Sequence, residues 1–175
     1  MLPGPPPDAP SPAHGDCIPE WRGQRKRQRV SDAGKDPLIF ELMTVIIPYM
    51  EAKYRVSKLP DDRAIAGLSL GGHQAIFIGL THAQQFRYVG AFSSGLPNQQ
   101  AFEEKYGPTL AQEAARLKLI WIGYGTRDPA RPKAESEKKM FDRCGVKYQS
   151  QETPGGHVWA NWRLYLSQFA PLRFR

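Results

Sequence analysis

The residues best placed to do chemistry lie in the segment Gly-Leu-Ser-Leu-Gly-Gly at 67–72. The segment has Gly-x-Ser-x-Gly spacing and joins a short apolar run, 64–68, that predicts a strand to a helical pattern over 73–80. In a nucleophile elbow the serine lies on a strained turn, where glycines avoid clashes with one another and with the substrate. This context favours Ser69 as a nucleophile, with the Leu70 N–H and the helix N-terminus facing a developing oxyanion. The alternative is a glycine-rich connection in which serine is an ordinary helix N-cap.

A serine hydroxyl needs a base, and the base needs an acid that orients it. Asp128 follows the apolar run 119–123, and His157 follows the next predicted strand in a Pro-Gly-Gly-His segment. Parallel strands end at one edge of a sheet, so we expect both side chains to lie near Ser69. The chain order Ser, Asp, His is also that of the α/β-hydrolase fold. We therefore predict a catalytic triad of Ser69, Asp128 and His157.

Each partner of the serine also has an alternative interpretation. Asp128 could cap a helix or a turn, since aspartate is favoured at both positions. His157 could be a surface or packing histidine at the start of the last helix. Glu152 is a second candidate for the acid, but it belongs to the region of the last predicted strand rather than to the loop beyond it.

The remaining polar candidates are weaker. We expect His73 to be structural, His82 to cap the carbonyls at the end of its helix, and His14 to lie in an unstructured segment. Ser93 and Ser94 end a predicted strand without a glycine elbow, so we do not expect either to be a nucleophile, although both could line the cleft. No cluster has metal-ligand spacing, and no glycine-rich loop suits a dinucleotide or a P-loop, so we expect no metal and no cofactor.

The elements that must position these residues alternate along the chain. The apolar patterns predict strands at 64–68, 88–92, 119–123 and 146–151, and helices at 38–54, 73–80, 109–117, 133–144 and 158–169. We expect Pro48 to interrupt and kink the first helix. Strands that alternate with helices of this length predict an α/β fold, with a mostly parallel sheet covered by helices on both faces.

Composition limits the class of protein. The 175 residues fit one domain, and 41% hydrophobic with 23% charged residues is typical of a globular chain. No window approaches the run of about 18 apolar residues needed to cross a bilayer. The opening residues, 1–7, lack the apolar core of a signal peptide, so we expect no export signal there, and we assign no cellular compartment. Cys17 and Cys144 are too far apart for a zinc site or a disulfide framework.

The first 35 residues differ from the rest. Seven of the 16 prolines fall within the first 19 residues, and five of the ten residues at 21–30 are basic. We expect residues 1–35 to be a flexible arm and residues 36–175 to be the folded domain. The net charge of +7 is partly local to this arm, which lacks the interleaved aromatics of a nucleic-acid platform. A solvated arm is therefore preferred over a nucleic-acid or targeting patch, and we expect neither nucleic acid nor membrane as a partner.

Several segments resemble the feruloyl esterase and enterochelin esterase family of α/β-hydrolase serine esterases, over residues 36–175. The resemblance rests on 66–72, 74–75, 79–82, 88–93, 121–123, 155–159 and 162–163. The Ser-x-Gly-Gly-His segment at 69–73 is also similar to S-formylglutathione hydrolase, but the carboxyl-terminal segments 155–159 and 162–163 fit the feruloyl esterase group better. The resemblance implies hydrolysis of carboxylic esters, often acyl or aryl esters on plant-wall sugars, with the triad on Ser69, Asp128 and His157. The implied substrate is a small-molecule or carbohydrate ester.

The sequence departs from that family at its start. Residues 1–35 resemble neither the family's opening strands nor its His-Gly-rich loop, which supplies a second oxyanion N–H. We therefore expect the carboxyl-terminal part of the fold, with an open sheet edge at 64–68 through which copies could associate. A serine carboxylesterase is the leading hypothesis. The alternative is a non-catalytic or weakly active remnant, which a serine-directed fluorophosphonate probe would not label.

Overall fold

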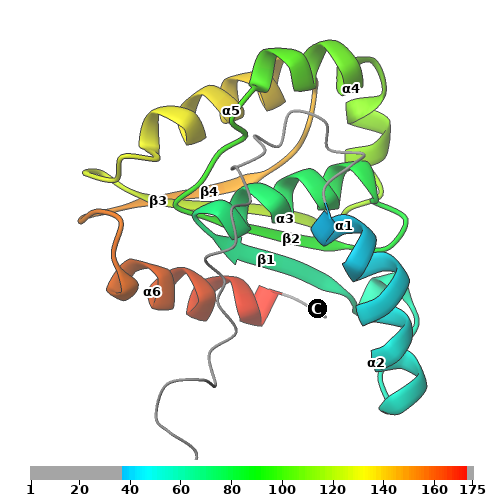
Figure 1. Ribbon diagram of the computed structural model, residues 1–175. Coiled ribbons are helices and arrows are strands. Elements are labelled where there is room, and N and C mark those ends of the chain that lie inside the picture. The colour runs from blue at the N-terminus through cyan, green and yellow to red at the C-terminus, as the bar shows by residue number, and fades with distance from the viewer. Residues whose placement is uncertain (1–36, 173–175) are drawn as a thin grey trace, which may run out of the picture. The chain divides into compact units, whose positions relative to one another are not determined.

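The computed structural model describes residues 37–172. The predicted arm at 1–35, its basic run at 21–30, Cys17 and His14 lie outside the described residues. Within the described part, strands and helices alternate from β1 to α6, as Figure 1 shows. Short 3-10 turns at Pro60–Asp62 and Ala170–Leu172 precede β1 and follow α6.

The sheet has four strands, and all of them are parallel. They are β1 (Ala64–Leu68), β2 (Tyr88–Phe92), β3 (Leu119–Gly125) and β4 (Gln149–Thr153), in spatial order β1-β2-β3-β4. Leu68 lies opposite Phe92, and Phe92 lies opposite Gly123, so the carboxyl ends of these strands are level. The predicted α/β class is confirmed. This register brings the loops that follow the strands to one edge of the sheet.

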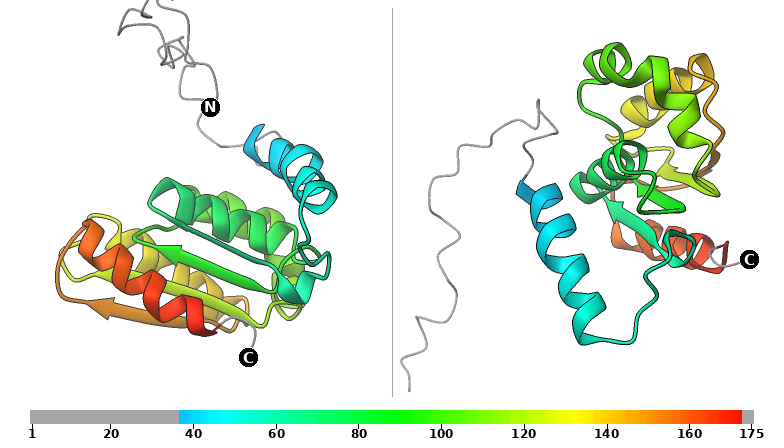
Figure 2. Two further views of the ribbon diagram at one scale, coloured as in Figure 1. Left: turned by 90° about the horizontal axis from the view of Figure 1, so that it is seen from below. Right: turned by 90° about the vertical axis from the view of Figure 1, so that its right-hand side faces the viewer.

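Helices cover both faces of the sheet. One face carries α3 (Leu70–Thr81), α4 (Gln99–Ala114) and α5 (Arg131–Arg143), and the other carries α6 (Trp159–Phe169), as Figures 1 and 2 show. No helix within residues 37–172 combines the length and the apolar character that crossing a membrane requires.

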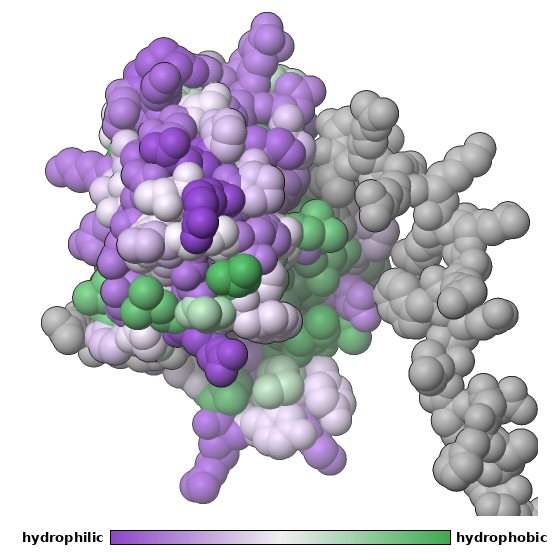
Figure 3. All heavy atoms as spheres, turned by 90° about the vertical axis from the view of Figure 1, so that its left-hand side faces the viewer, coloured by the Kyte–Doolittle hydropathy of each residue, from purple (hydrophilic) through white to green (hydrophobic). Residues whose placement is uncertain are grey.

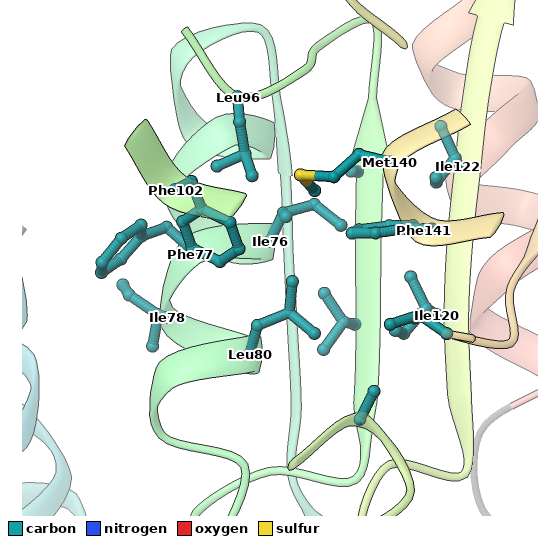
Figure 4. Packing of buried hydrophobic residues seen from close by; sticks show 14 of the residues in the cluster. Ile76, Phe77, Ile78, Leu80, Leu96, Phe102, Ile120, Ile122, Met140 and Phe141 are labelled. Atoms are coloured by element: carbon teal, nitrogen blue, oxygen red, sulfur yellow. The ribbon is translucent and has the colours of Figure 1, made fainter. Parts of the chain in front are cut away.

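Side chains alternate between two cores along β1, β2 and β3. Val89 and Ile120 point to the larger core under α3, α4 and α5, where Figure 4 shows Ile76, Leu80, Met140 and Phe141 closing over the sheet. The neighbouring positions point to the other face, where they pack against Tyr165 and Phe169 of α6. Burial on both faces explains why β2 and β3 read as continuous apolar runs in the sequence.

The first helix contains a wider turn just before its proline. It runs as α1 (Pro37–Glu41), a π-helical segment (Leu42–Ile46) and α2 (Ile47–Lys53), close to the predicted 38–54. Pro48 lacks an N–H, and its ring would clash with the carbonyl of Thr44, four residues earlier, in a regular α-helix. The π-helical segment increases the room at this point and accommodates the proline.

Helix α4 begins at Gln99, well before the predicted start at Thr109. The side chain of Asn98 caps its first turn by accepting a hydrogen bond from the Ala101 N–H at 3.2 Å. Pro108 lies inside the helix. Phe102 packs against Phe77 of α3 with ring centroids 5.7 Å apart, and this tertiary contact supports the turns before the proline.

Strand β4 begins at Gln149 rather than at the predicted Val146. Helix α5 ends in a Schellman motif, in which Gly145 has a φ of 71° and the Val146 N–H donates to the Phe141 carbonyl at 2.9 Å. Val146 is buried in the larger core as part of this cap. The apolar residue that suggested a strand therefore belongs to the end of the preceding helix.

Strand β1 lies at the edge of the sheet and pairs only with β2 among residues 37–172. All residues of β2 and β3 are buried, whereas Ala66 in β1 is exposed and its neighbours are half-buried. The strand that carries Ser69 at its end thus has one open side in the described part of the chain.

Candidate active site

Ser69 lies on the tight turn between β1 and α3. Its φ of 52° and ψ of −118° are a strained combination for a residue with a side chain. Backbone hydrogen bonds hold the turn, because the Ser69 N–H donates to the Phe92 carbonyl at 2.8 Å and the Ser69 carbonyl accepts from the His73 N–H at 3.2 Å. The hydroxyl is thereby presented at the carboxyl edge of the sheet.

The glycines around the serine are not equally constrained. A Cβ on Gly67 would lie 2.3 Å from the backbone of Gly71, and one on Gly72 would lie 2.8 Å from the Gly67 carbonyl oxygen. A Cβ on Gly71 itself would meet no atom within 4 Å. Neighbouring atoms therefore leave no room for a side chain at Gly67 or Gly72, whereas the space around Gly71 would accept one.

The structure brings the three predicted residues together in one hydrogen-bonded row. The Nε2 of His157 lies 3.1 Å from Ser69 Oγ, and its Nδ1 lies 3.0 Å from Asp128 Oδ1. A carboxylate can only accept, so Nδ1 carries the proton and Nε2 is free to accept from the serine hydroxyl. The residues are 88 and 29 positions apart in sequence, and the parallel strands that precede them supply the proximity.

The environment of Asp128 favours its ionised form. Its side chain is fully buried, and Oδ1 also accepts the Ala130 N–H at 2.8 Å. Burial alone raises the pKa of this carboxyl, but the Ser93 hydroxyl, the Ala130 N–H and His157 outweigh burial and hold the pKa below its usual value. The second oxygen, Oδ2, is buried and has no hydrogen-bond partner among the described residues, although the Ser93 hydroxyl lies close enough to the carboxyl to lower its pKa.

Two further side chains adjoin the row. The Trp162 ring meets the His157 ring edge-on, with centroids 5.0 Å apart and planes at 88°, and its Nε1–H donates to Ser93 Oγ at 2.9 Å. Ser93, which we did not expect to be a nucleophile, ends β2 with a φ of 51°. From the sequence, Ser93 was a candidate only for lining the cleft, and Trp162 entered only through the family resemblance. The available signal was a tryptophan on the helix directly after the histidine, together with a serine at a strand end.

The other sequence candidates lie elsewhere or have other partners. Glu152 pairs with Arg131, at 2.6 Å, rather than with His157. His73 is buried in the first turns of α3. At the end of that helix, the backbone N–H of His82 bonds a helix carbonyl, while its ring lies 2.9 Å from the Thr81 hydroxyl. Within residues 37–172, His, Cys, Asp and Glu side chains form no group of three or more that could hold a metal ion.

Apolar side chains are exposed beside the row. Leu70, Val158 and Trp159 are 63%, 47% and 65% exposed. Figure 3 views the molecule from the side where the strands end, and hydrophobic residues lie there among hydrophilic ones. Trp159 meets Trp162 edge-on, with centroids 4.9 Å apart, so this apolar surface continues to the histidine.

Comparison with protein families gives a match over most of the chain. The sequence model of the esterase family, described as "Putative esterase", matches residues 18–171. The resemblance noted from the sequence starts at Asp36, and the family match starts earlier, at residue 18. A curated relative, an endo-1,4-beta-xylanase/feruloyl esterase of Xylanibacter ruminicola, is 26% identical over 136 residues, which are 77% of this chain and 17% of that protein.

Solved structures share the fold. A ferulic acid esterase is 26% identical with a TM-score of 0.68, over 75% of this chain and 58% of its own. A ferulic acid esterase from Anaeromyces mucronatus, solved in complex with ferulic acid, is 23% identical with a TM-score of 0.65, over 78% of this chain and 53% of its own. The chain thus spans less than two thirds of the length of these relatives.

Proposed function

Because the chain belongs to the esterase family, we propose that it hydrolyses carboxylic esters through an acyl-enzyme formed on Ser69. The observation that carries this proposal is the hydrogen-bonded row from Ser69 through His157 to the buried Asp128, at 3.1 and 3.0 Å. An unactivated serine hydroxyl is a weak nucleophile at neutral pH, and this arrangement supplies the base that it needs.

In the first half of the reaction, Ser69 Oγ attacks the ester carbonyl carbon while its proton passes to Nε2 of His157. The negative charge of the ionised Asp128 stabilises the imidazolium and keeps the Nδ1 proton in place. The carbonyl oxygen becomes an oxyanion near the Leu70 N–H, which stands in the first turn of α3 and has no partner within the helix.

Collapse of this intermediate breaks the bond to the alcohol, which leaves with the proton from His157. A water molecule then attacks the acyl-enzyme, and His157 takes its proton and returns it to Ser69 Oγ. The products are a carboxylic acid and an alcohol, and the enzyme is restored. Each proton transfer uses Nε2 of His157, which the hydrogen bond to Ser69 Oγ places beside the nucleophile.

For the substrate we propose feruloyl- or acetyl-type esters of plant-wall carbohydrates. The relatives named feruloyl or ferulic acid esterases support this choice. The exposed apolar surface of Leu70, Val158 and Trp159 also supports it, because an aromatic acyl group gains by leaving water against such side chains.

Labelling by a fluorophosphonate probe tests the nucleophile, and turnover of aryl acetate and methyl ferulate tests the reaction. Ser69→Ala and His157→Ala should each abolish labelling and hydrolysis, and the double variant should be no worse than either single one, because the residues act as a unit. A Ser69→Ala protein with most of its turnover intact would refute the assignment. A parent chain that neither labels nor turns over substrate would favour the non-catalytic alternative.

A further inference from the structure

Four side chains lie together at the carboxyl edge of the sheet and are joined in sequence by three contacts. Asp128 accepts from His157, the His157 ring contacts the Trp162 ring, and Trp162 donates to Ser93 Oγ. The Ser93 hydroxyl lies close enough to Asp128 to lower the pKa of its carboxyl, while Asp128 Oδ2 has no hydrogen-bond partner among the described residues. The ester hydrolysis proposed above uses the first of these contacts and leaves the Trp162–Ser93 hydrogen bond without a role.

The direction of that hydrogen bond determines where the Ser93 proton goes. An indole N–H can only donate, so Ser93 Oγ must accept from Trp162 at 2.9 Å. The hydroxyl proton of Ser93 is then left for another acceptor. Oδ2 of Asp128 is buried and otherwise unsatisfied among the described residues, and a buried acceptor without a donor is costly.

The backbone of Ser93 supports a specific role for its side chain. Ser93 and Ser69 both have a positive φ, and they end the neighbouring strands β2 and β1. The Ser93 N–H donates to the Gly123 carbonyl at 2.7 Å, which ties the residue to β3, the strand that leads to Asp128. Strained residues of this kind persist where the surrounding structure requires their geometry.

We infer that Trp162 and Ser93 are positioning residues: the indole N–H orients the Ser93 hydroxyl toward Asp128 Oδ2, so that Oδ1 stays aimed at Nδ1 of His157. Trp162 also limits the tilt of the imidazole by its edge-on contact. Neither residue touches the reacting atoms. This inference deepens the proposed function and rests on it for its catalytic meaning, but its structural content is measurable without turnover.

The test separates hydrogen bonding from packing. Ser93→Ala removes the hydroxyl, and Trp162→Phe removes the N–H but keeps an aromatic ring against His157. Ser94→Ala is the matched control, because it makes the same change at the next residue, where the buried hydroxyl oxygen has no partner among the described residues. The double variant Ser93→Ala/Trp162→Phe tests whether the two residues affect His157 through the same hydrogen bond.

Nitrogen NMR of ¹⁵N-histidine protein provides a readout that does not depend on catalysis. The chain has four histidines, and His157→Gln assigns the signal of interest. The parent and Ser94→Ala should hold the His157 proton on Nδ1. Ser93→Ala and Trp162→Phe should each give a mixture of Nδ1–H and Nε2–H tautomers, because the carboxylate is free to turn.

Ester turnover gives the second readout. Each single variant should lose about 10- to 100-fold, the scale of one hydrogen bond to a charged group, and the double variant should lose no more than the worse single one. An inactive parent with the expected tautomers would count against the proposed function and not against the positioning network. An unchanged Nδ1–H tautomer in both single variants would overturn the inference, as would loss of the fold in both.

Discussion

At the scale of single residues, the site depends on which group holds each proton. Asp128 is fully buried yet stays ionised, because donors around it lower its pKa below the usual value despite burial. Its charge fixes the Nδ1 proton of His157 and leaves Nε2 as the acceptor for Ser69. In the proposed mechanism, the reactivity of the serine therefore depends on a carboxylate that it does not touch.

Neutralising this carboxylate should remove the proposed esterase activity without unfolding the protein. Asp128→Asn preserves the size of the side chain but no longer holds the histidine tautomer, and turnover should fall by about 10⁴-fold. Glu152→Gln is the control, because Glu152 pairs with Arg131 instead of His157. Steady-state kinetics on an aryl ester would measure both. Activity of Asp128→Asn within a few-fold of the parent would mean that another acid orients His157.

At the scale of elements, the elbow between β1 and α3 requires close backbone packing at one glycine and not at the other. Gly67→Ala would place a methyl group 2.3 Å from the backbone of Gly71, which has no flexible side chain to move aside. Gly71→Ala meets no atom within 4 Å and lies in the first turn of a helix, where alanine is preferred to glycine.

The two substitutions should therefore have opposite effects on the free energy of unfolding. We expect Gly67→Ala to lower it by about 1–3 kcal/mol, the range for overpacked interiors, and to displace Ser69. We expect Gly71→Ala to raise it by up to about 1 kcal/mol. Urea denaturation followed by circular dichroism would measure both, and equal destabilisation by the two changes would contradict this account of the elbow.

A second feature at this scale is a carboxyl group buried in α5. Glu137 is fully buried, and its Oε2 accepts the Leu96 N–H at 2.8 Å, which anchors the loop after β2. Burial raises the pKa of Glu137 to about 8, against an ordinary value of 4.5. The folded protein thus holds a proton that the unfolded chain releases. The associated stability is full below about pH 4.5 and is lost as the pH rises through about 8.

Glu137→Gln should remove this pH dependence, because the amide does not titrate and can still accept from Leu96. Between pH 5 and 8, the parent should lose up to about 1.4 kcal/mol of unfolding free energy per pH unit relative to the variant. Urea unfolding at both pH values would measure the difference. Glu104→Gln, at an exposed position on α4, is the control. Parallel pH profiles for the parent and Glu137→Gln would contradict the buried neutral carboxyl.

At the scale of the whole molecule, the open side of β1 leaves the strand that carries Ser69 unpaired on one side in the region that the structure describes. Among residues 37–172 no strand pairs with it, so its outer N–H and C=O groups have no partners in a sheet. Ala66 is exposed on this strand. Parallel sheets are normally covered on all sides, and an open edge beside apolar residues favours pairing between chains.

We accordingly propose that the chain associates with itself through β1, and a charged residue there should weaken the association. Ala66→Lys places a lysine on the edge strand, a common protection against edge-to-edge pairing. Ala115→Lys makes the same change at an exposed residue just after α4. Light scattering over a concentration series should show an oligomer for the parent and Ala115→Lys, and a smaller species for Ala66→Lys. Identical masses for all three proteins would rule out association through this edge.

The sequence by itself determined the alternation of strands and helices, the elbow around Ser69, and the order in which Asp128 and His157 follow it. These features are local, and parallel strands bring their carboxyl ends to one edge whatever the loops contain. Contacts between distant residues decided the rest. The aromatic packing that extends α4 and the burial of Glu137 both depend on neighbours far away in sequence. The Trp162–Ser93 hydrogen bond spans 69 residues, and only the folded sheet with α6 against it brings that donor and acceptor together.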